Sequence, residues 1–123
     1  MPARDFQEAL VTLANTLCNP TTLTPELSDA LKYADELIRA QPTPLTVNTH
    51  RVLVMLAASI AVDMQDYVHD ALMLITFGTP QAVWNALPES TRKVLDSCWP
   101  EEGGLTFVGK IGIAVVSEGF LYR

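Results

Sequence analysis

The segment from Asn48 to Phe77 carries one long helical pattern whose character changes halfway along. Between Val52 and Val62 every residue is apolar or small, whereas acids occur from Asp63 onward. A helix that is apolar on all sides must be surrounded by protein, and a helix with acids on one side borders water. The segment therefore predicts the central helix of a small bundle, either continuous over residues 49–77 or broken near Asp63.

Capping signals predict further helices on both sides of this segment. Thr24-Pro25 and Thr79-Pro80 each place a capping threonine before a proline at the first helical position. A chain of 123 residues fits one domain. We therefore expect a mainly α fold, a compact bundle of four to five helices forming a single domain over residues 1–123. The remaining helices are predicted over residues 3–18, 25–40, 80–87 and 88–99.

The C-terminal segment, residues 105–122, differs in composition from the rest of the chain. It is rich in β-branched residues and contains Gly109 and Gly112, and both features disfavour a helix. One interpretation is a short β element, a hairpin that turns at Gly109-Lys110. The other is a buried helix whose inward residues are Phe107, Ile111, Ala114 and Val115. The β interpretation is slightly favoured, because a short apolar run cannot be assigned from its period alone.

Composition and charge exclude several classes of function. Charged residues make up 18% of the chain, against roughly 25% in an average protein, which indicates a well-filled core, an apolar surface that a partner covers or, as we favour, a mixture of the two. The net charge is −6 and the eight basic residues are scattered, so no nucleic-acid partner is expected. Acids near the N-terminus argue against a signal peptide, and the run over residues 52–62 is too short to span a bilayer. We expect no membrane partner and a cytoplasmic location.

An acidic stripe is the one candidate for a metal site. Asp63, Asp66 and Asp70 fall within an arc of about 60° on a helix, and several carboxylates can share a divalent cation. Glu26 and Asp29 could supply an opposite pair of oxygens. The simpler interpretation is a solvated helix face, because aspartate side chains are short and acids are rarely buried.

Catalytic motifs are weak. His69-Asp70, with His50 upstream, is similar to the His…His-Asp pattern of helical metal-dependent phosphohydrolases, but a matching final aspartate is not evident. Cys18 and Cys98 have no neighbouring base in the sequence, and the glycines form no phosphate-binding loop. We therefore expect no cofactor and regard a hydrolase that uses the acidic stripe as the alternative function.

The sequence favours a small binding or adaptor protein that acts through protein–protein contacts, has no catalytic activity of its own and forms a homodimer. The apolar C-terminal segment is the expected contact surface, since an interface is anchored by large apolar and aromatic side chains. A further alternative is a binder of small apolar ligands with a pocket lined by Met55, Met64 and Met73. The predicted partner-binding residues are Trp99, Phe107, Ile111, Phe120, Leu121 and Tyr122.

Overall fold

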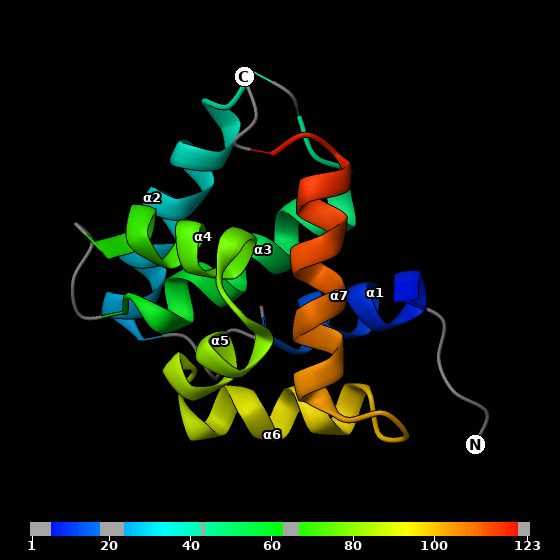
Figure 1. Cartoon of the computed structure of the whole chain (residues 1–123). Helices are drawn as coiled ribbons and strands as arrows, with labels where there is room; N and C mark the ends of the chain where they lie inside the picture. The colour runs from blue at the N-terminus through cyan, green and yellow to red at the C-terminus, as the bar shows by residue number, and fades with distance from the viewer. Residues whose placement is uncertain (1–5, 18–23, 43, 63–66, 121–123) are drawn as a thin grey trace.

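The structure, a computed structural model, describes residues 6–17, 24–42, 44–62 and 67–120. These residues form a mainly helical, compact fold, and no strand occurs among them (Figure 1). The helices are α1 (Phe6–Leu17), α2 (Pro25–Arg39), α3 (Val47–Ile60), α4 (Val68–Phe77), α5 (Pro80–Ala86), α6 (Glu89–Cys98) and α7 (Gly104–Ser117).

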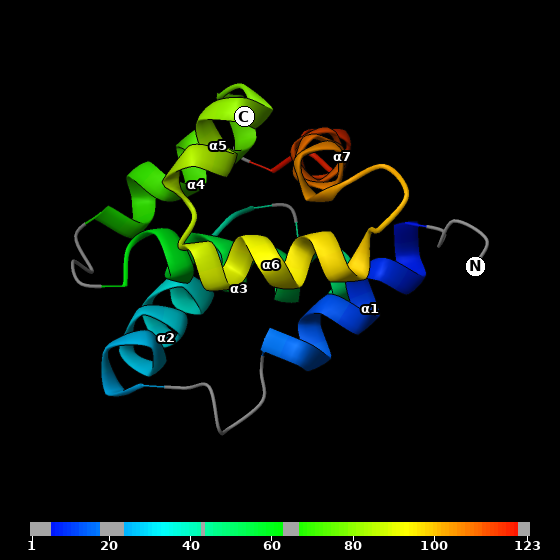
Figure 2. The same ribbon diagram turned by 90° about the horizontal axis from the view of Figure 1, so that it is seen from below.

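Helix α3 lies at the centre of the packing. It contacts α1, α2, α4 and α7, and every residue from Val52 to Ser59 is buried. Around it, α6 contacts both α1 and α7, and α5 contacts α4 and α7 (Figure 2). The run that is apolar on all sides is therefore buried as predicted, because neighbouring helices cover it from several directions.

Of the two alternatives for residues 49–77, the structure shows two helices separated by a break near Asp63, and the continuous helix is wrong. Helix α3 ends at Ile60, and α4 begins at Val68 and packs against α3. A straight helix of thirty residues would be about 45 Å long, whereas a compact domain of this size is only about 35 Å across. The break after Ile60 allows α4 to fold back and cover α3. The break and the helical C-terminal segment raise the helix number from the four to five predicted to the seven described.

The favoured prediction of a β element in the C-terminal segment is also wrong, because α7 occupies Gly104–Ser117. Phe107, Ile111 and Val115 have no exposed surface, and Ala114 is half-buried. Burying each large apolar side chain contributes about 1.5–3 kcal/mol, whereas a β-branched residue or a glycine in a helix costs about 1 kcal/mol or less. Tertiary burial therefore outweighs the local preference of the sequence.

The helix starts follow the capping signals. The Oγ1 atoms of Thr24 and Thr79 accept hydrogen bonds from the backbone N–H groups of Leu27, at 3.1 Å, and Ala82, at 3.2 Å. The α7 start is different, because Gly103 has a φ of +88° that favours glycine. At Gly104 a Cβ atom would lie 2.6 Å from the Trp84 ring, so only glycine fits there without a shift of its neighbours.

We predict that Ala57→Asp unfolds the domain. Ala57 is fully buried in α3, and an unpaired carboxylate in a packed core costs several kcal/mol, a large share of a typical stability of 5–15 kcal/mol. Urea denaturation followed by circular dichroism measures the loss. The matched control is Ala82→Asp on the exposed side of α5, which should change the stability by at most about 0.5 kcal/mol. Cooperative, wild-type-like unfolding of Ala57→Asp would contradict the central position of α3.

Candidate functional site

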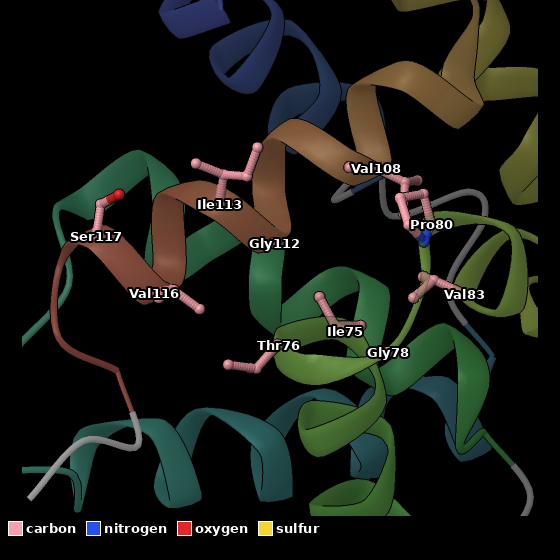
Figure 3. Close-up of a pocket in the computed structure, with 11 residues that line it drawn as sticks. Ile75, Thr76, Gly78, Pro80, Val83, Val108, Gly112, Ile113, Val116 and Ser117 are labelled. Carbon is pink, nitrogen blue, oxygen red and sulfur yellow. The ribbon is translucent and has the colours of Figure 1, made fainter.

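An open apolar groove of about 440 Å³ lies between α7 and the α4–α5 pair (Figure 3). All of the described residues that line it are uncharged, and most are aliphatic or glycine. Such a surface can bind an apolar partner through shape and burial, but it offers no group for acid–base or metal chemistry. The lining residues are Ile75, Thr76, Gly78, Pro80, Val83, Val108, Gly109, Gly112, Ile113, Val116 and Ser117.

Two glycines of α7 form the floor of the groove. At Gly112 a Cβ atom would lie 3.0 Å from the carbonyl oxygen of Ile75, and at Gly109 it would lie 3.2 Å from Pro80 Cγ. The backbone of α7 therefore approaches α4 and α5 closely, and the absence of side chains leaves the surface hollow. Next to this floor, Ile113 projects from α7 with 69% of its surface exposed.

The polar atom of Thr76 is already engaged. Its hydroxyl donates a hydrogen bond to the Leu72 carbonyl oxygen at 2.8 Å, within α4. Thr76 and Ile75 on α4 and Val116 on α7 border the same opening (Figure 3). Ser117 supplies the other side-chain hydroxyl of the described lining, so binding in this groove would depend mainly on apolar contact and shape.

The aromatic and aliphatic residues predicted to bind a partner lie in the core. Phe107, Ile111 and Phe120 are fully buried, and Trp99 is 6% exposed. The Phe107 ring lies 5.1 Å from the Trp99 ring and 5.5 Å from the Phe6 ring, measured between centroids. These side chains are inaccessible to a partner in this conformation. Two further predicted residues, Leu121 and Tyr122, lie outside the described part of the chain.

The groove side of α7 lies away from the stripe of Phe107, Ile111 and Val115. It carries one exposed apolar side chain, Ile113, beside three half-buried residues, Gly109, Gly112 and Val116. The four residues are spaced i, i+3, i+4, i+7, which is one face of a helix. The predicted partner-binding residues do not include Ile113 or Val116.

The structure brings together no acidic metal site among the residues it describes. Asp70 is exposed in the first turn of α4, and Asp63 and Asp66 lie outside the described residues. No group of three potential metal-ligating side chains occurs in the described part of the chain.

Two of the three methionines predicted to line a ligand pocket can be placed, and they do not line this groove. Met55 is buried in α3 and Met73 is 39% exposed on α4, and neither lines the groove. The third, Met64, lies outside the described residues. Aliphatic side chains and glycines line the groove instead.

A histidine–aspartate pair connects α2 and α3. His50 Nε2 lies 2.7 Å from Asp35 Oδ1, and Arg39 Nε donates a hydrogen bond to Asp35 Oδ2 at 2.8 Å. The Arg39 hydrogen bond, followed by the His50 hydrogen bond, lowers the pKa of Asp35 below its usual value, although partial burial opposes the shift. His50 is thus paired with Asp35 on α2, while His69 is exposed on α4.

Comparisons with known proteins give no family. The sequence matches no protein-family model, no curated protein and no solved structure. Among the described helices, none is both long enough and apolar enough to cross a bilayer. The geometry of the described residues is therefore the basis for a functional proposal.

We predict that Asp70→Asn changes the free energy of unfolding by no more than about 0.5 kcal/mol, because the side chain is exposed and solvated. It should also leave any metal content of the purified protein unaltered. Urea denaturation and elemental analysis of wild type and variant test both statements. Loss of a stoichiometric cation on this substitution would favour the hydrolase alternative.

A second prediction concerns Asp35→Asn. A carboxylate whose pKa is lowered by folding stabilises the fold above its unfolded pKa of about 3.9, and this contribution is lost as the pH falls through the folded pKa. The Asp35 side chain is 37% exposed, so after solvent screening we expect a loss of about 0.5–1 kcal/mol at pH 7. The difference from wild type should shrink below about pH 4. Urea denaturation at several pH values tests this, and a pH-independent difference would contradict it.

Proposed function

We propose that this chain is a small binding or adaptor protein that acts through protein–protein contacts, and that it forms a homodimer through the groove between α7 and the α4–α5 pair. The observation that carries the proposal is the exposed Ile113 beside a groove with an entirely uncharged lining. An isoleucine with 69% of its surface in water gains free energy when a partner covers it.

A second copy of the chain is the partner that this geometry fits best. A two-fold interface requires one patch to carry both a projection and the hollow that receives it. Helix α7 has both, because the projecting Ile113 follows directly after Gly112 on the groove floor. A two-fold axis near Gly112 would place the Ile113 side chain of each copy over the glycine floor of the other.

The net charge of the chain also supports a dimer interface at the groove. Each copy carries a net charge of −6, so two copies repel one another when they approach through acidic surfaces. An interface centred on an uncharged groove avoids direct contact between like charges. The low proportion of charged residues, 18%, also leaves room for an apolar patch on the surface.

We predict that Ile113→Glu weakens self-association at least tenfold, because it places two carboxylates in an apolar two-fold interface. The monomer should remain folded, since Ile113 is exposed. Sedimentation velocity over a dilution series measures the dissociation constant. The matched control is Val11→Glu, which introduces the same charge at an exposed aliphatic residue of α1. A wild-type chain that stays monomeric at high micromolar concentration would overturn the proposal, and so would equal effects of the two substitutions.

A further inference from the structure

A second cavity, also of about 440 Å³, lies where the C-terminal end of α2 meets the N-terminal end of α3. It is separate from the groove on α7, and the two share no lining residue. Its volume falls within the range of pockets that hold small molecules. The side chains that give it its chemistry are Ile38, Leu45, Val47, Arg39, His50 and Arg51.

One part of the lining is basic. Arg39 and Arg51 both border the cavity, and none of the described residues that line it is acidic, although the chain as a whole carries a net charge of −6. The charge of Arg39 is partly balanced by Asp35, which lies 2.8 Å from its Nε atom, whereas no carboxylate of the described residues is bound to Arg51. Their guanidinium groups also match the geometry of a carboxylate, which they can bind through paired hydrogen bonds.

Hydrogen bonds within the chain engage part of this basic lining. Arg39 is bound to Asp35 through Nε, and its two terminal nitrogens have no hydrogen-bond partner among the described residues. Asp35 also pairs with His50, and the Arg51 Nη2 atom is 3.4 Å from Asn15 Oδ1. The Arg39 side chain is 70% exposed, so the contact with Asp35 restricts it only in part before a ligand binds.

The carboxylates that adjoin the cavity are engaged in bonds within the chain. Asp35 is paired with Arg39 and His50, and Glu118 accepts a hydrogen bond from the backbone N–H of Thr46 at 2.6 Å. The Glu118 contact also shows that the N-terminal end of α3 accommodates an anion, as expected from the helix dipole. Neither carboxylate lines the cavity.

The other part of the lining is apolar. Ile38 and Leu45 are buried, whereas Val47 has 72% of its surface exposed. A hydrocarbon group that packs against these three side chains would cover Val47 and be removed from water itself. The cavity thus combines a basic part with an apolar part.

We propose that this cavity binds a small organic anion that consists of a carboxylate and a short hydrocarbon chain. Arg39 and Arg51 bind the carboxylate, and Ile38, Leu45 and Val47 contact the hydrocarbon chain. This site is independent of the proposed dimer interface, so either can be present without the other.

The test uses hexanoate as the probe and isothermal titration calorimetry on the full chain. We expect saturable binding with a dissociation constant of roughly 0.1–10 mM, as is typical of a ligand this small. Arg51→Gln and Arg39→Gln should each weaken binding at least tenfold. The control Lys93→Gln removes the same charge from an exposed site on α6 and should change the affinity less than twofold. Thermal unfolding of each variant verifies that it is folded.

Three further probes distinguish the parts of the proposal. Hexan-1-ol lacks the carboxylate, acetate lacks the hydrocarbon chain, and inorganic phosphate is an anion without either; each should bind at least tenfold more weakly than hexanoate. Equal binding of hexan-1-ol would show that the arginines are not used, and equal binding of phosphate or acetate would show that the apolar part is not used. Either result would overturn the proposal, as would the absence of saturable hexanoate binding or an equal effect of Lys93→Gln.

Discussion

Burial of the Val52–Ser59 segment of α3 on all sides is the constraint on which the rest of this structure depends. A helical segment with no polar face cannot border water, so its neighbours must surround it. The chain meets this requirement with α1, α2, α4 and α7, which all contact α3. This arrangement places the inward face of α7 in the core, leaves Gly109 and Gly112 half-buried beside α4 and α5, and exposes Ile113.

The two cavities arise at places where this packing is incomplete. In the groove on α7, glycines bring the backbones close together and leave no side chains to fill the surface. At the junction of α2 and α3, the helix ends and the connecting residues leave space that Arg39 and Arg51 border. The chemistry of the two sites therefore differs. The groove offers shape and apolar surface, whereas the cavity combines two arginine side chains with apolar surface.

The parts of the fold that sequence predicted are those with local causes. Thr24-Pro25 and Thr79-Pro80 mark helix starts because capping involves residues only three positions apart. The helical state of α7 has a distant cause, the burial of Phe107, Ile111 and Val115 against other helices, which local propensity does not contain.

The side-chain pairs of the candidate sites also depend on contacts between residues far apart in the sequence. His50 and Asp35 are fifteen residues apart and meet only through the packing of α2 on α3. Periodicity placed Phe107 and Ile111 on the inward face of a helix, as the structure has them, but it did not decide between a helix and a strand for this segment.

The contact between Phe6 and Phe107 has a consequence for how the protein is made. Their rings, 5.5 Å apart, join the first described helix to the last, so the core contains contacts between nearly opposite ends of the chain. Forming such a contact brings the two ends of the long intervening chain together. The loss of chain entropy on closing this loop opposes the contact. During synthesis on the ribosome, α3 emerges well before α7. Until α7 is available to pack against it, part of the apolar surface of α3 is exposed to water. The interval between the two is the period in which the nascent chain is most exposed to aggregation and most in need of a chaperone.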